Sequence, residues 1–271
     1  MTATAPDMEV EYNNRARVPE HPGIIEGWAR DAADYRETGI HDLDIAYGPH
    51  ARQRYDLFGR GDKNKTCIVF IHGGYWQALD KSFFSHMAAG ANAADYDVAI
   101  PSYRLCPEVT VADIVDDMFA FCRSLGESGR RDIVVAGHSA GGHLAACLLA
   151  RGTHGRSVVR AALPISGLFD LIPLVGTSIN DALRLTDDEA RRQSPLFWTP
   201  PATGTALVAY VGASEPSEYQ RQSRTIADAW GNAGIHTSYR KLAGDNHFTA
   251  IASLARPDGE LTRALLDLAA R

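Results

Sequence analysis

Residues 132–150 combine an apolar run, a turn bracketed by glycines and a second apolar run. The first run, residues 132–136, is rich in β-branched side chains and predicts a buried strand. The second, residues 144–150, is rich in alanine and leucine and predicts a helix. Between them lies the sequence Gly-His-Ser-Ala-Gly-Gly-His at 137–143, with a glycine two residues to either side of Ser139. A side chain at either flank would collide with the strand or helix that the turn joins, so the segment predicts a strand that passes sharply into a helix.

Short β-rich runs alternate with longer helical segments along the rest of the chain. The expected strands are residues 43–46, 54–58, 67–71, 98–100, 133–136, 159–164, 206–211 and 237–242. The expected helices begin near residues 81, 110, 141, 216 and 248, and a last one covers 259–270. Near-continuous apolar strands alternating with helices predict an α/β fold with a mostly parallel, eight-stranded sheet covered on both faces. The first two strands, joined by a turn at residues 48–49, predict an antiparallel hairpin at the sheet edge.

Two stretches do not follow this alternation. Residues 1–40 contain a helical segment before the sheet begins, and residues 166–203 form a long insertion rich in proline and leucine between two strands. We expect one domain over residues 1–271, with the first stretch as an N-terminal extension and the second as a cap-like insertion. Ligands of open α/β sheets bind beyond the carboxyl ends of the strands, where both stretches could cover a site.

Composition excludes several classes of function. The net charge of −6 comes without a long basic run, so no nucleic-acid partner is expected. The first twelve residues are polar and acidic, and no run of 18 apolar residues occurs, so we expect neither a signal peptide nor a membrane partner, and a cytoplasmic location. The 4 cysteines lack CxxC spacing, which favours reduced thiols over a disulfide framework or a zinc site, so no metal is expected. We also expect no cofactor.

The turn around Ser139 matches the GxSxG nucleophile elbow, which predicts a serine nucleophile supported by a base and an acid. His247 is the expected base, because it follows the last strand in the loop 243–248. Of the other histidines, His138 adjoins the serine, but its side chain is expected to point away from it. Glu215 is the expected acid in the loop after strand 206–211. The alternatives for the acid that remain open are Glu218, Asp245 and Asp170.

The oxyanion of an acyl-transfer reaction needs backbone N–H donors. Ala140, directly after the serine, is one expected donor. The others are Gly73 and Gly74, which follow the strand 67–71, because adjacent glycines let the backbone turn its N–H groups toward a substrate carbonyl. Neither glycine segment has the GxxxxGK[ST] spacing or a GxGxxG motif, so a phosphate-binding loop is not predicted.

Three motifs together resemble the arylformamidase (kynurenine formamidase) branch of the α/β-hydrolase fold family. They are His-Gly-Gly-Tyr-Trp at 72–76, Gly-His-Ser-Ala-Gly-Gly at 137–142 and Asn-His-Phe at 246–248. The resemblance extends to Tyr-Asn-Asn-Arg at 12–15, to residues 105–110 and to residues 218–223, so it covers nearly the whole chain. The aromatic residues after the two glycines distinguish this branch from hormone-sensitive-lipase-like esterases, which usually carry a third glycine there.

The resemblance implies hydrolysis of the formamide of N-formyl-L-kynurenine to formate and L-kynurenine, in tryptophan catabolism. It implies that Ser139 is the nucleophile and His247 the base, and Glu215 falls where the family has a carboxylate, often Asp. Pro216 departs from the serine that the family more often shows.

The leaving arylamine of such a substrate needs a roomy aromatic wall. Tyr75 and Trp76 follow the oxyanion loop directly, and they are expected to contact the substrate together with His72 and Phe169. Sequence alone does not place these rings in a pocket, and ordinary core packing is the competing interpretation.

Two other functions stay open. A carboxylesterase or amidase for other small acyl compounds would use the same triad, and a non-catalytic binding protein on this fold would usually lack the base or the nucleophile. The sequence does not determine the oligomeric state, and a homodimer through edge strands or outer helices is a common arrangement for this fold.

Overall fold

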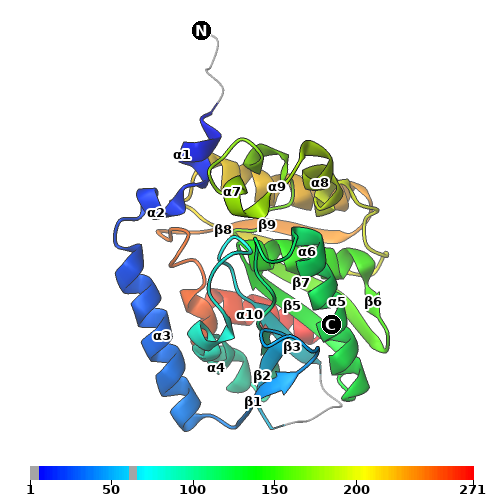
Figure 1. Ribbon diagram of the computed structural model, residues 1–271. Coiled ribbons are helices and arrows are strands. Elements are labelled where there is room, and N and C mark those ends of the chain that lie inside the picture. Colours follow the sequence, from blue (N-terminus) through cyan, green and yellow to red (C-terminus); the bar gives the residue numbers. More distant parts are fainter. Residues whose placement is uncertain (1–5, 61–65) are drawn as a thin grey trace.

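The computed structural model describes residues 6–60 and 66–271. Within these residues the centre of the molecule is a nine-stranded sheet in the order β1-β2-β4-β3-β5-β7-β8-β9, with β6 paired to β7 (Figure 1). The strands are β1 (His41–Ala46), β2 (Arg54–Phe58), β3 (Cys67–Ile71), β4 (Val98–Pro101), β5 (Asp132–His138), β6 (Thr153–His154), β7 (Ser157–Ile165), β8 (Ala206–Gly212) and β9 (His236–Leu242).

The strand pairing confirms the predicted α/β fold. From β4 to β9 along the main path, all neighbours are parallel, whereas β1, β2 and β4 pair antiparallel at one edge. The eight predicted strands all form, and their ends differ from the prediction by at most two residues. The prediction missed β6, because a strand of two residues is too short to carry an alternating pattern.

The α-helices are α1 (Met8–Tyr12), α2 (Asn14–Arg17), α3 (His21–Thr38), α4 (Ala89–Asn92), α5 (Val111–Glu127), α6 (Ala140–Arg151), α7 (Asn180–Leu183), α8 (Asp187–Arg192), α9 (Ser217–Asn232) and α10 (Glu260–Ala269). Single 3-10 turns are η1 (Lys81–Phe83), η2 (Ser85–Ala88), η3 (Ile172–Leu174), η4 (Pro195–Phe197) and η5 (Ala252–Ala255). None of the helices in the described part of the chain is long and apolar enough to cross a membrane.

Two of the predicted helices are wrong. The segment near residue 81 forms η1, η2 and the short α4 instead of one helix. No helix begins at Phe248, because the side chain of Asn246 accepts hydrogen bonds from the amides of Phe248 and Thr249 and so holds a turn there.

Helices cover both faces of the sheet, as predicted (Figure 1). Successive residues of β3 point to opposite faces, so that Val69 packs with α5, α6 and α9, while Ile68 and Phe70 pack with α3, η2 and α10. A strand buried on both faces is apolar throughout, which explains the unbroken Cys-Ile-Val-Phe-Ile run of β3.

The two stretches that interrupt the alternation meet each other. Glu9 in α1 accepts hydrogen bonds from the amide and the hydroxyl of Ser178, which precedes α7 in the insertion. α1 also contacts α9. The first five residues of the predicted extension, which are also part of the polar N-terminal stretch, lie outside the described residues. The division into one domain with an extension and an insertion stays a prediction.

Candidate active site

The turn between β5 and α6 has the geometry of a sharp elbow. Ser139 has φ of 55° and ψ of −117°, a conformation that residues other than glycine rarely adopt. A Cβ on Gly137 would lie 2.1 Å from the carbonyl oxygen of Gly141, and a Cβ on Gly141 would lie 2.0 Å from that of Ile71. The two glycines are therefore needed because the turn packs against itself and against the end of β3.

A continuous series of hydrogen bonds runs from this serine to a carboxylate. Ser139 Oγ lies 3.1 Å from His247 Nε2, and His247 Nδ1 lies 2.7 Å from Glu215 Oε2. Glu215 follows β8 and His247 follows β9, so both loops begin at the carboxyl ends of strands. All three side chains are buried. This arrangement can move a proton from the serine hydroxyl to the imidazole, whose far nitrogen is held by the carboxylate.

The carboxylate of Glu215 is fixed on both oxygens. Its Oε1 accepts hydrogen bonds from the amide of Gly212, at 2.7 Å, and from the hydroxyl of Ser166, at 2.5 Å. Ser166 directly follows β7, is fully buried and has φ of 53°. Sequence reasoning missed Ser166, although its position at the carboxyl end of a strand between β5 and β8 was a usable signal.

The other acids considered from sequence face different partners. Glu218 and Asp170 both pair with Arg221. Asp245 contributes its backbone carbonyl, which accepts from the amide of Ser214. Among the acids considered, Glu215 is thus the one that bonds to His247.

His138 lies against His247, which corrects the expectation that its side chain points away from the site. Its Nε2 is 2.8 Å from the backbone carbonyl oxygen of His247, and the two ring centroids are 4.7 Å apart. Burial, and secondly the neighbouring His247, lowers the pKa of His138 well below its usual value. A neutral His138 donates from Nε2 and steadies the loop that carries His247.

The loop after β3 packs directly on the serine. A Cβ on Gly73 would lie 3.0 Å from Ser139 Cβ, and Gly74 has φ of 114°, which favours glycine. Within residues 6–60 and 66–271, the amides of Gly73, Gly74 and Ala140 donate no hydrogen bond to the protein. Ala140 is the first residue of α6, where amides lack intrahelical partners. These three amides are free to bind a ligand.

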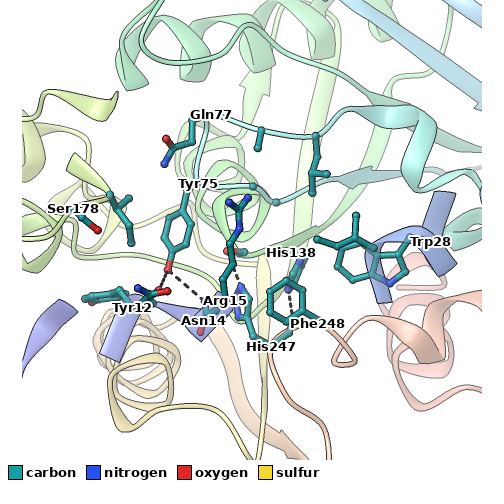
Figure 2. Close-up of a pocket in the computed structure, with 18 residues that line it drawn as sticks. Tyr12, Asn14, Arg15, Trp28, Tyr75, Gln77, His138, Ser178, His247 and Phe248 are labelled. Atoms are coloured by element: carbon teal, nitrogen blue, oxygen red, sulfur yellow. Dashed lines mark hydrogen bonds between the residues drawn. The ribbon is translucent and has the colours of Figure 1, made fainter. Parts of the chain in front are cut away.

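A cavity of about 370 Å³ opens over the serine (Figure 2). Its lining comes from the N-terminal helices, the loop after β3, the elbow, the insertion and the loop after β9. The lining residues are Tyr12, Asn13, Asn14, Arg15, Ile25, Trp28, Gly73, Gly74, Tyr75, Gln77, Ala78, Leu79, His138, Ser139, Ser178, Ile179, His247 and Phe248. Of the four residues expected from the sequence to contact the substrate, Tyr75 lines the cavity.

The structure corrects the expectation for the other three, because Trp76, His72 and Phe169 are fully buried in the protein core away from the cavity. Trp76 packs edge-on against His143, with ring centroids 5.0 Å apart. Tyr75 and Trp76 have φ of 50° and 56°, so the loop turns sharply at this point and the two neighbouring rings separate. The His72 ring stacks on Tyr103 at 4.4 Å, and burial lowers its pKa to about 4.

The N-terminal helices are tied to the site by a buried cluster of hydroxyl groups. Tyr75 OH donates to the carbonyl oxygen of Tyr12 at 2.6 Å and lies 2.5 Å from Tyr219 OH. The side-chain Nδ2 of Asn14 donates to Tyr219 OH at 2.8 Å, and the Tyr219 ring lies 4.7 Å from that of His247. The sequence singled out residues 12–15 only through the family resemblance, because contacts this far apart along the chain leave no local pattern.

The described residues contain no group of three or more His, Cys, Asp or Glu side chains that could hold a metal ion. All four cysteines are free and buried.

Comparisons with known proteins agree with this geometry. A family model for the α/β-hydrolase fold matches residues 68–232. The kynurenine formamidase of Drosophila melanogaster is 30% identical over 249 residues, which cover 86% of this chain and 83% of the relative. That of Salmo salar is 26% identical, with 83% and 81% covered. A crystal structure from Silicibacter sp. TM1040, provisionally described as a thioesterase, is 32% identical, with 97% of this chain and 100% of that chain covered and a TM-score of 0.88.

Proposed function

This chain belongs to the α/β-hydrolase fold family, in the branch of the kynurenine formamidases, and from this membership we propose that it is a serine hydrolase with Ser139 as its nucleophile. The observation that carries the proposal is the unbroken series of hydrogen bonds from Ser139 through His247 to Glu215. A strained, buried serine beside an imidazole with a fixed carboxylate has the parts that an activated nucleophile requires.

In the first step His247 Nε2 accepts the proton of Ser139 Oγ while this oxygen attacks the acyl carbon. The developing negative oxygen is stabilised by the amides of Gly73, Gly74 and Ala140. The C–N or C–O bond to the leaving group then breaks, and the imidazolium donates its proton to the departing nitrogen or oxygen. Glu215 stabilises the imidazolium and holds its ring in the required orientation.

In the second step water replaces the leaving group. His247 accepts a proton from this water, the resulting hydroxide attacks the acyl-enzyme carbon, and Ser139 Oγ departs with the proton returned by the imidazolium. The products are an acid and the regenerated enzyme.

The substrate that we propose is N-formyl-L-kynurenine, cleaved at its formamide to formate and L-kynurenine. Two relatives that share most of their length with this chain are kynurenine formamidases. The aromatic rings of Trp28, Tyr75 and Phe248 on the cavity wall support an aryl leaving group.

The serine mechanism predicts the outcome of the variant Ser139→Ala. Its hydrolysis of N-formylkynurenine should fall by several orders of magnitude in kcat, while the circular dichroism spectrum and melting temperature stay near those of the wild type. Ser223→Ala is a matched control, because the hydroxyl of Ser223 is also buried, has no hydrogen-bond partner among the described residues and lies outside the cavity. Turnover that survives in Ser139→Ala would exclude a covalent mechanism at this serine.

A carboxylesterase or thioesterase acting on other small acyl groups is the second candidate, favoured by the relative provisionally described as a thioesterase. It would use the same three residues. A comparison of kcat/KM for N-formylkynurenine with that for p-nitrophenyl acetate and butyrate separates the two: a value far higher for the esters favours the second candidate. A non-catalytic binding protein would hydrolyse none of them.

A further inference from the structure

Arg15 is a lining residue of the cavity that the proposed mechanism does not use. It lies in α2, in the Tyr-Asn-Asn-Arg motif at residues 12–15. Figure 2 shows its side chain extending from α2 over the cavity, with the guanidinium group in this view between Tyr75 and His138.

The side chains that line the cavity include a positive charge and no negative charge. Arg15 is the one lysine or arginine among its lining residues, and no aspartate or glutamate is among them. The triad acid Glu215 is not a lining residue and is held by His247, Ser166 and Gly212. The cavity therefore offers a positive charge without a protein anion to neutralise it.

The two acids of α1 are already engaged. Glu9 accepts hydrogen bonds from Ser178, and Glu11 accepts from the hydroxyl of Ser217 and the amide of Glu218. Arg17, two residues further along α2, pairs with Glu11 at 3.9 Å. Arg15, in contrast, makes no ion pair and no side-chain hydrogen bond within the part of the chain that the structure describes.

The backbone that carries Arg15 is fixed in place. The preceding residue, Asn14, is buried and donates to Tyr219 OH, while the side chain of Asn13 accepts from the amide of Ala16 and caps α2. The anchored helix thus fixes the backbone from which the exposed Arg15 side chain reaches the cavity.

We infer that Arg15 is a specificity-determining residue that binds a carboxylate on the leaving group of the substrate. This inference rests on the proposed function, since it assigns a role within the same cavity. A guanidinium forms charge-assisted, bidentate hydrogen bonds to a carboxylate, which matches its planar geometry better than an ammonium does. The substrate class is an acyl amide or ester whose leaving group is both aromatic and anionic, with the acyl carbon at Ser139 and the carboxylate at the α2 side of the cavity.

Matched substrates test this inference. We would measure kcat/KM for phenyl acetate and for 3-carboxyphenyl acetate, and likewise for N-formyl-L-kynurenine methyl ester and N-formyl-L-kynurenine. The readout is the value of kcat/KM for the carboxylate substrate divided by the value for its neutral counterpart. In Arg15→Gln this ratio should fall about 10-fold, mainly through KM, and Arg15→Lys should retain part of it. The ratio in the wild type should also fall as ionic strength rises, more steeply than in Arg15→Gln.

Arg17→Gln is the matched control, because it removes the same charge from the same helix at a residue that does not line the cavity. Its ratio should stay at the wild-type value. If the ratio of kcat/KM for the carboxylate and neutral substrates is unchanged in Arg15→Gln, the assignment is overturned. An equal fall of this ratio in Arg15→Gln and Arg17→Gln would also overturn it, because it would show a general effect of positive charge on α2 instead of a contact with Arg15. Failure of the proposed function looks different: the wild type would then hydrolyse neither member of a pair, or Ser139→Ala would remain active.

Discussion

At the scale of single residues, Ser166 supports Glu215, the acid of the triad that we propose. Its hydroxyl and the amide of Gly212 are the two donors to Glu215 Oε1, while the other oxygen of Glu215 faces His247. Two donors at one oxygen leave the second oxygen in a fixed position for the imidazole. Ser166 is thus a positioning residue in our proposal, because it acts through Glu215.

The variant Ser166→Ala removes one of these donors and should lower kcat by about 10-fold, because a hydrogen bond to a charged group is worth roughly 1.5–3 kcal/mol and Gly212 still holds the carboxylate. The pH profile of kcat should shift as well, which a purely structural defect would not produce. The measurement is kcat between pH 5 and 9 for this variant and for Ser223→Ala. A kcat and a pH profile equal to those of the wild type would contradict the role of Ser166.

At the scale of elements, α1 and α2 are tied to the insertion and to α9. Glu11 accepts from Ser217 Oγ at 2.9 Å and from the amide of Glu218 at 2.8 Å, both in the first turn of α9. A carboxylate at this position satisfies an otherwise unpaired amide and interacts favourably with the positive end of the helix dipole. Glu11 therefore contributes to α9 in the way that a capping residue does, although it lies about two hundred positions earlier in the chain.

Replacement of this carboxylate by Glu11→Ala should lower the free energy of unfolding by about 1 kcal/mol, a typical cost for the loss of a cap. Urea denaturation followed by circular dichroism measures it. Glu108→Ala removes an exposed carboxylate outside the N-terminal helices and should change stability by less than about 0.5 kcal/mol. Equal stability of the two variants would show that Glu11 does not hold α9.

The pattern of the elements was readable from the sequence because the central strands β3, β5 and β8 are buried apolar runs and the helices α5, α9 and α10 each carry one buried face. The loop at 72–76 was not, because consecutive positive φ angles at Gly74, Tyr75 and Trp76 direct neighbouring side chains to different environments. Tyr75 therefore faces the cavity, whereas Trp76 enters the core. No spacing rule distinguishes two adjacent aromatic residues in such a loop.

At the scale of the whole molecule, several histidines are buried as neutral groups. Burial lowers the pKa of His72, His86 and His143 from 6.5 to about 4 in each case. Between these two pH values the unfolded chain binds protons that the folded chain does not. The folded state is therefore most favoured above pH 6.5, and the stability is lost as the pH falls toward 4.

We expect the free energy of unfolding to decrease by up to ~1.4 kcal/mol per pH unit for each of these histidines between about pH 6.5 and 4. Urea midpoints at intervals of half a pH unit measure this slope. His86→Gln should show a slope that is smaller by up to ~1.4 kcal/mol per pH unit, because the variant lacks one of the titrating groups. His86 suits this test because it does not line the cavity and its Nδ1 has no hydrogen-bond partner among the described residues. A slope that is the same with and without His86 would contradict the assignment.

The sequence by itself determined the α/β class and the succession of strands and helices along the chain. It also determined which residues at the strand ends could form a triad. Strong local signals made this possible. The glycines around Ser139 are required by contacts within a single turn and with the adjacent strand. The alternation of apolar strand segments with helical segments predicts the mostly parallel sheet. His247 and Glu215 follow their strands directly, so a topological rule was enough to select them as candidates.

Only the tertiary structure decided which side chains surround the serine. Tyr12, Asn14 and Arg15 come from the first helices, whereas Ser166 and Tyr219 come from the second half of the chain. Their proximity depends on how separate layers pack, and the free energy of that packing is distributed over the whole core instead of being encoded in neighbouring residues. For the same reason the sequence could not tell that Trp76 belongs to the core and that Arg15 lines the cavity.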